Sequence, residues 1–304
     1  MLIDEIIDYC DKEYQAYRYN CGCGQCNHPS KKCSGSCYEC LYQIHFPNRF
    51  NSEPIKKLYD CPKMIYHYVC QYSHLYATEL LCAFQEEVDY LKDFPYYHIL
   101  SLGCGGCTDL MAFERFYKDL GVNMPISYMG IDCNDLWKQV NSQIREYCKK
   151  KNIGYDDKYF DVFNLFQQRN VPDANILVIS YLISYLYNTK QISYFDTFVE
   201  NVVKNIILKK EKGGKFLIII NDVNSHHRGR NYFNYFINKL QNHKCLKIDF
   251  KYKYFDTGNL YPPQRLGTPY AIYESLFPIP NEIATNYHAQ TDCKQTIQLL
   301  LEVI

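Results

Sequence analysis

The chain has 304 residues, which is enough to bury a full hydrophobic core, and we expect one large domain with an appendage. Its 33 Lys and Arg residues balance its 33 Asp and Glu residues, which excludes a bulk electrostatic attraction to nucleic acid or to an anionic membrane. No run of ~20 apolar residues is present, and the first residues are acidic where a secretory signal is basic, so we expect a cytoplasmic protein with no membrane partner.

Two helical stretches are expected before the first strand. Residues 2–19 place their isoleucines on one face and their charges elsewhere, which is typical of an amphipathic helix. Residues 54–92 carry too many apolar and tyrosine side chains for one narrow stripe, so we expect one or two helices that pack on two sides. Together they define the first of two expected domains, residues 1–95.

Potential metal ligands gather in residues 21–45, between these helices. Zn²⁺ favours four Cys or His ligands, and short Cys-x2-Cys turns bring two thiolates to one ion. The spacing predicts a module with two zinc ions, whose fold the metal supplies because glycine, proline and serine interrupt the segment. Disulfides with uninvolved histidines are the alternative. The candidate ligands are Cys21, Cys23, Cys26, His28, Cys33, Cys37, Cys40 and His45.

A strand, a glycine turn and a helix follow at residues 97–120. The apolar run 97–102 is followed by a loop that contains Gly103 and Gly105, and residues 107–120 are amphipathic. The next strand, 126–131, ends on Asp132, where a carboxylate is placed to accept hydrogen bonds from ribose hydroxyls. A dinucleotide fingerprint requires a third glycine where this chain has threonine, so the motif predicts a ribose-bearing ligand other than a dinucleotide.

An alternation of strands and helices continues to the C-terminus and predicts an α/β domain over residues 96–304. Residues 256–294, rich in tyrosine and proline, form an insertion of the kind that covers a site. The expected helices are 135–150, 189–210 and 230–242, and the expected strands are 158–163, 175–180, 215–221, 244–255 and 295–304.

The segment Ile99–Cys107, ILSLGCGGC, resembles the first motif of the class I S-adenosylmethionine (SAM)-dependent methyltransferases, with Cys107 where the last glycine usually stands. Asp132 and Asp161 are similar to the family's acidic residues after the second and third strands. The resemblance implies a Rossmann-like, mostly parallel seven-stranded sheet with an antiparallel C-terminal strand. It also implies SAM as the cofactor, bound by Leu102, Gly103, Cys104, Gly105, Asp132, Cys133, Asp161, Val162, Ser180 and Tyr181.

Candidates for the catalytic side chains follow the fourth and fifth strands. Methyl transfer needs alignment of the acceptor, and a base only where the acceptor must lose a proton. Tyr181 and Tyr185 are candidates for walls of the acceptor site, with core packing as the alternative. His226 is a candidate general base, with a solvated turn as the alternative.

Two functions therefore remain open at this point. The first is a methyltransferase that transfers a methyl group by in-line displacement to a protein, RNA or small-molecule acceptor. The second is a non-enzymatic protein whose zinc module binds nucleic acid or protein and whose methyltransferase-like domain is inert or a sensor. We expect the insertion to fold over the acceptor side of the cofactor pocket and to supply aromatic walls to it.

Overall fold

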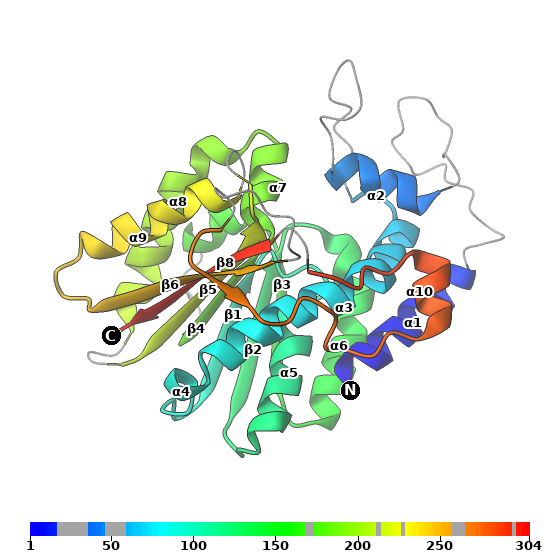
Figure 1. Ribbon diagram of the computed structural model, residues 1–304, viewed down its shortest axis with the longest axis horizontal. Helices are drawn as coiled ribbons and strands as arrows, with labels where there is room; N and C mark the ends of the chain where they lie inside the picture. The colour runs from blue at the N-terminus through cyan, green and yellow to red at the C-terminus, as the bar shows by residue number, and fades with distance from the viewer. Residues whose placement is uncertain are drawn as a thin grey trace.

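The computed structural model shows helices on both faces of one central sheet (Figure 1). It describes residues 1–16, 36–45, 59–167, 173–210, 214–225, 229–256, 265–293 and 296–304.

The sheet has eight strands in the order β3-β2-β1-β4-β5-β8-β6-β7. The first five strands are parallel, and β8 lies antiparallel between β5 and β6, which confirms the predicted antiparallel C-terminal strand. The sheet has one strand more than the seven expected, because the short strand β7 pairs with β6 at the edge. The strands are β1 Tyr97–Leu102, β2 Ile126–Asp132, β3 Gly154–Tyr159, β4 Ile176–Ser180, β5 Phe216–Val223, β6 Ile248–Phe255, β7 Thr268–Tyr270 and β8 Thr296–Val303.

Two expected elements are placed differently. The third strand is Gly154–Tyr159 rather than 158–163, because an edge strand pairs with β2 alone and needs no continuous apolar run. The expected helix 189–210 is the shorter helix Phe195–Asn205, and Lys190, with a positive φ of 61°, lies in the turn before it. The helices of the described chain are α1 Leu2–Ala16, α2 Cys37–His45, α3 Pro62–Glu86, α4 Val88–Leu91, α5 Thr108–Leu120, α6 Lys138–Lys150, α7 Leu182–Asn188, α8 Phe195–Asn205, α9 Phe233–Gln241 and α10 Asn281–Tyr287.

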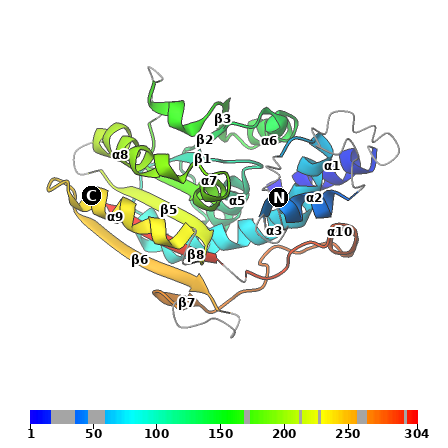
Figure 2. The ribbon, with the colours of Figure 1, turned by 90° about the horizontal axis from the view of Figure 1, so that it is seen from above.

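Two hydrophobic cores lie on the two faces of the sheet, because successive strand side chains point to opposite faces. Ile99 packs into the core with α1, α3, α5 and α6, whereas Leu100 packs into the core with α7, α8 and α9. Figure 2 shows these two helical layers on either side of the strands. The carboxyl ends of the parallel strands therefore lie between two packed helical layers.

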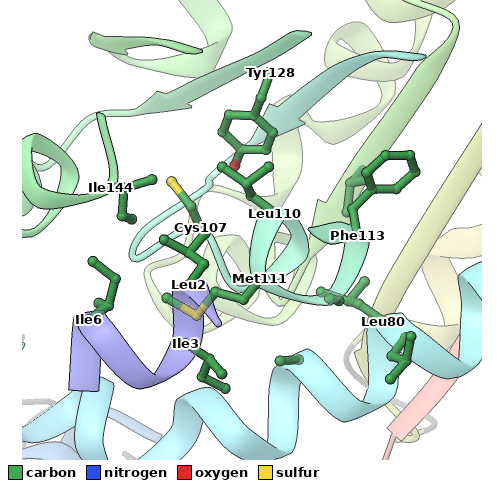
Figure 3. Packing of buried hydrophobic residues seen from close by; sticks show 14 of the residues in the cluster. Leu2, Ile3, Ile6, Leu80, Cys107, Leu110, Met111, Phe113, Tyr128 and Ile144 are labelled. Carbon is green, nitrogen blue, oxygen red and sulfur yellow. The ribbon is translucent and has the colours of Figure 1, made fainter. Parts of the chain in front are cut away.

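The N-terminal helices share the first of these cores with the sheet. Leu2, Ile3 and Ile6 of α1 lie close to Met111 of α5 and to α3 (Figure 3). Helix α3 is buried on nearly all sides, as its residues predicted, and it contacts both α1 and α5. A boundary at residue 95 stays a prediction, and the described residues on its two sides pack as one core. In the described ranges, no helix is both long and apolar enough to cross a membrane.

The insertion runs along α3 to α10, which contacts α1, and then returns to α3, where the Gln290 N–H donates to the Gln71 carbonyl. Tyr270 of β7 packs on Phe255 with ring centroids 4.7 Å apart, and its hydroxyl donates to Gln298. Phe277 is buried in the core with α3, and the Tyr287 hydroxyl of α10 donates to Asp11 of α1 at 2.5 Å. The described part of the insertion is therefore structural along most of its length.

Candidate functional site

A cavity of about 490 Å³ opens at the carboxyl ends of the parallel strands. It lies beside β1 and β4, where the order of the strands reverses, which is the usual place for a ligand in an open α/β sheet. Its volume lies in the range of small-molecule sites.

The glycine loop after β1 forms one side of this cavity. Gly103 and Gly105 have positive φ angles of 74° and 49°, a backbone conformation that costs glycine little. A Cβ on Gly103 would lie 3.2 Å from the Leu182 side chain, and one on Gly105 would lie 3.4 Å from Trp137. The two glycines therefore keep bare backbone facing the cavity.

Asp132 lies opposite the loop, at the end of β2. Its carboxylate accepts hydrogen bonds from the backbone N–H groups of Gly105 at 2.9 Å and Asn134 at 2.8 Å. Burial raises the pKa of Asp132, and these hydrogen bonds act in the opposite direction. A carboxylate has about four acceptor positions, so two bonds leave room for a pair of hydroxyl donors from a ligand.

Most of the other residues predicted to bind the cofactor also line the cavity. Asp161 follows β3, where one carboxylate oxygen accepts the Phe163 backbone N–H at 2.9 Å. Leu102 and Cys104 are the exceptions, because neither side chain lines the cavity: Leu102 is fully buried in the sheet, and Cys104 packs beside Gly130. The predicted residues that do line it are Gly103, Gly105, Asp132, Cys133, Asp161, Val162, Ser180 and Tyr181.

The lining also includes residues that the sequence did not indicate. Trp137, the only tryptophan of the chain, packs against the glycine loop from the turn before α6. Four aspartates, Asp60, Asp132, Asp135 and Asp161, line the cavity, and no Lys or Arg lies among its described lining residues. The cavity therefore suits a positively charged ligand better than a phosphate.

A second cavity, of about 350 Å³, lies next to the first. Tyr59, Tyr68, Tyr181 and Tyr185 line both cavities, so their side chains form the boundary between the two. Tyr181 adopts a left-handed conformation with φ 55° at the start of α7, and its ring lies 4.4 Å from that of Tyr76. Tyr181 and Tyr185 therefore lie between the two cavities, and their role as walls of an acceptor site stays a prediction.

The remaining walls of the second cavity come mainly from α2 and α3. Eight of its lining residues are tyrosines: Tyr38, Tyr42, Tyr59, Tyr68, Tyr72, Tyr76, Tyr181 and Tyr185. From the described part of the insertion, only Gln290 and Asp292 contribute. The expectation that the insertion supplies aromatic walls is therefore wrong for residues 265–293, because their aromatic side chains pack against α3, α1 and the sheet edge instead.

A buried carboxylate, Glu79 of α3, lies at the wall of the second cavity and was not indicated by the sequence. Its exposed fraction is 0%, and it accepts hydrogen bonds from the Tyr181 hydroxyl at 2.9 Å and the Asn221 amide at 2.9 Å. The Thr296 hydroxyl also donates to it, at 2.5 Å. Burial raises the pKa of Glu79 to about 7, although these hydrogen bonds oppose that shift.

His45 of α2 lies in this cavity rather than in a metal site. Its two ring nitrogens are 2.8 Å from the Tyr59 hydroxyl and 3.1 Å from the Tyr72 hydroxyl. Burial lowers its pKa to about 4, so the imidazole is neutral near pH 7. With both nitrogens bonded to hydroxyls, this side chain has no position left for zinc, and its assignment as a ligand is corrected.

The other predicted metal ligands are only partly described. Cys37 and Cys40 lie one turn apart on α2. Within the described ranges, no group of three or more His, Cys, Asp or Glu residues is arranged to hold a metal ion. The ligands Cys21, Cys23, Cys26, His28 and Cys33 and the candidate base His226 lie outside the described residues.

Comparisons with known proteins give likenesses of structure only. No family model matches the chain, and no curated protein matches it in sequence. A putative class I SAM-dependent methyltransferase from Listeria monocytogenes is 11% identical, with a TM-score of 0.47 over 99% of this chain and 87% of the other. A SAM-dependent methyltransferase from Archaeoglobus fulgidus is 13% identical, with a TM-score of 0.40 over 74% and 94%. The plantazolicin methyltransferase BpumL, in complex with SAH, is 13% identical, with a TM-score of 0.37 over 97% and 98%.

Proposed function

We propose that this chain is a SAM-dependent methyltransferase. The observation that carries the proposal is the first cavity, in which a bare glycine loop faces the Asp132 carboxylate and aspartates occur without Lys or Arg among the described lining residues. SAM has a ribose with two hydroxyls and carries positive charge on its sulfonium and ammonium groups. A dinucleotide would instead bring a pyrophosphate into an acidic lining, which is unfavourable.

The residues of the chain would divide the work between the two cavities. Asp132 holds the ribose hydroxyls, and the glycine loop leaves room for the methionine part of the ligand. When bound, SAM supplies a methyl group that an acceptor nucleophile can displace in line. Tyr181 and Tyr185, at the boundary, confine the acceptor to an approach from the second cavity, so the contribution of the protein is mainly orientation.

Calorimetric titration with SAH, the demethylated product of SAM, tests this proposal. We expect SAH to bind with a dissociation constant in the micromolar range or below, about −8 kcal/mol or better. Because Trp137 lines the cavity and is the only tryptophan, its fluorescence should change on binding. NAD serves as the control ligand and should bind far more weakly. Tight NAD binding together with no SAH binding at millimolar concentration would overturn the proposal.

We further propose that the Cys-rich segment binds zinc through Cys21, Cys23, Cys26, Cys33, Cys37, Cys40 and His28, without His45. The support is the sequence spacing, together with the position of Cys37 and Cys40 on successive turns of α2. Elemental analysis of the purified chain should find about two zinc ions. Zinc-free protein with these cysteines oxidised in pairs would refute the assignment.

A further inference from the structure

The second cavity combines several features that binding of SAM in the first cavity does not explain. Its lining is dominated by tyrosine rings, and two carboxylates, Glu79 and Asp292, also line it. No Lys or Arg lies among the lining residues that the structure describes. Tyrosine rings attract cations to their faces, and low-dielectric walls strengthen the attraction of a carboxylate for a cation.

When it is ionised, Glu79 carries a charge that the described part of the protein does not neutralise. Its hydrogen-bond donors, Tyr181, Asn221 and Thr296, are all uncharged, and no ion pair to a Lys, Arg or His is formed by this carboxylate in the described ranges. Glu87, just after α3, differs in this respect, because it pairs with Lys251 at 3.1 Å. An ionised carboxylate buried beside a cavity without a cation is costly unless a ligand supplies the cation.

Gln71 of α3 provides an independent indication of a ligand in the same cavity. Its side chain lines the cavity and is only 1% exposed, yet neither its amide nitrogen nor its amide oxygen has a hydrogen-bond partner in the described structure. Buried amides are nearly always hydrogen-bonded in native proteins. A polar ligand in the cavity would satisfy this amide and Glu79 together.

We infer that the second cavity binds a positively charged nitrogen group, an ammonium or a guanidinium, and that the acceptor of the methyl group is this nitrogen. Glu79 supplies the opposite charge, the tyrosine rings surround the cation, and Gln71 offers a hydrogen bond. The identity of the methyl acceptor rests on the proposed methyltransferase function, whereas the binding of a cation in the cavity does not.

The transfer step balances with these residues. The cationic nitrogen gives a proton to the Glu79 carboxylate and so regains its lone pair. That lone pair forms the new bond to the methyl carbon, while the carbon–sulfur bond breaks and its electron pair returns to sulfur. The products are a methylated nitrogen, which carries the positive charge, and a neutral thioether. Glu79 then releases its proton to water.

Three small probes of the same shape test the inference: benzylamine, which is cationic, benzyl alcohol, which is neutral, and benzoate, which is anionic. Each is titrated calorimetrically at pH 8 into the full chain saturated with SAH, so that the first cavity is filled. We expect benzylamine to bind at least about tenfold more tightly than benzyl alcohol, with benzoate the weakest. Equal binding of the alcohol, tighter binding of benzoate, or no benzylamine binding up to about 10 mM would overturn the inference.

Two variants test whether Glu79 causes the preference for benzylamine over benzyl alcohol. Glu79→Gln should reduce the ratio of benzylamine to benzyl alcohol affinity to within about twofold, whereas Glu282→Gln, at an exposed position on α10, should leave it unchanged. SAH affinity and the thermal unfolding midpoint check that both variants are folded. A folded Glu79→Gln protein that keeps the wild-type preference would overturn the role of this carboxylate.

A pH titration of the wild type provides the same test if Glu79→Gln does not fold. The preference for benzylamine should fall by up to about tenfold from pH 8 to pH 6, because Glu79, with a pKa of about 7, becomes protonated. The neighbouring Cys82, Cys293, Tyr68 and Tyr181 have raised pKa values and stay protonated in this range. Burial raises the pKa of Asp222 only to about 6, so this residue is mostly ionised from pH 7 to pH 8. His45, on α2, stays neutral, and the second lining carboxylate, Asp292, is only partly buried. A preference that is flat or rises toward pH 6 would contradict the inference.

The outcomes separate this inference from the proposed function. If SAH binds but the probes show no preference for the cation, the methyltransferase proposal stands and the inference fails. If SAH does not bind, the proposed function fails, and the same probes titrated into the unliganded chain still decide whether the second cavity selects a cation.

Discussion

The two cavities of this protein are built in different ways. The first is built on the turns at the strand ends, where the backbone of the glycine loop faces the cavity and holds Asp132. The second is made of side chains from α2 and α3, mostly tyrosine rings around a buried carboxylate. Backbone conformation imposes strict residue types that a sequence displays, whereas a cavity of side chains depends on how helices dock. This difference explains why the first cavity can be predicted from the sequence and the second cannot.

The largest expected effect tests whether the insertion belongs to the hydrophobic core or only covers a cavity. Phe277 of the insertion is 2% exposed and packs in the core with α3, so Phe277→Ala should lower the free energy of unfolding by about 3–5 kcal/mol. Chemical denaturation measures this loss. Tyr273→Ala, at a 40% exposed site in the same segment, should change stability by less than about 0.5 kcal/mol. If both variants lose similarly little stability, the insertion covers a cavity and is not part of the core.

The second expected effect is a pH dependence that arises in the second cavity. The pKa of Glu79 is about 7 in the folded chain against 4.5 when unperturbed, so between these values the native state holds a proton that the unfolded state has lost. The stabilisation is therefore complete below about pH 4.5 and is lost as the pH rises through about 7, a change on the order of 3 kcal/mol.

This effect is measured as the difference between the wild type and Glu79→Gln in denaturant unfolding at several pH values. Asp222 and the buried histidines also titrate, but they are common to both proteins and cancel in the difference. The wild type should lose stability relative to the variant on going from pH 4.5 to pH 8. Curves that run parallel across this range would mean that Glu79 keeps an ordinary pKa.

In the first cavity, the corresponding test is the loss of one carboxylate. Asp132→Ala should weaken SAH binding by about 1.5–3 kcal/mol, because charge-assisted hydrogen bonds to the ribose are removed. Asp135→Ala is the matched control: it removes an exposed carboxylate from the same cavity and should cost less than about 0.5 kcal/mol. Calorimetry measures both. Equal losses would show that the cavity selects its ligand by total charge rather than by the position of Asp132.

The contrast between backbone and side chains also explains how much of the fold the sequence predicts. The strand at 97–102 and the glycine loop were predicted correctly, because a buried parallel strand must be apolar and its turn must be glycine. The strand at 154–159 was placed four residues too late, because an edge strand tolerates charges such as Asp156 and Lys158. Apolar patterning therefore describes the centre of this sheet better than its edge.

The second cavity was missed because its residues resemble core residues. Tyr68, Tyr72 and Tyr76 recur every four positions on α3, which also describes an ordinary buried face. One signal was available: between Lys63 and Glu86, Glu79 is the only charged residue of the helix. A lone carboxylate within a helix that is buried on all sides requires a partner, and it could have directed attention to a site there.

The smallest expected effect separates two roles of one side chain in the first cavity. Asp161 lines the cavity, where it would accept one hydrogen bond from the adenine amino group against two from the ribose hydroxyls at Asp132, and one of its oxygens also accepts the Phe163 backbone N–H. Asp161→Ala should therefore weaken SAH binding by less than about 1 kcal/mol, through the adenine end of the ligand.

Asp249→Ala provides the control, since Asp249 accepts the backbone N–H of Phe250 in a similar way but is exposed on β6 and lines neither of the two cavities. Both variants lose a local bond to backbone, so their unfolding midpoints should fall by similar small amounts, whereas only Asp161→Ala should change SAH affinity. An Asp161→Ala protein with unchanged affinity would assign this residue to the turn after β3 alone. Recognition of the ligand by carboxylates would then rest on Asp132, the residue that the backbone of the glycine loop itself holds in place.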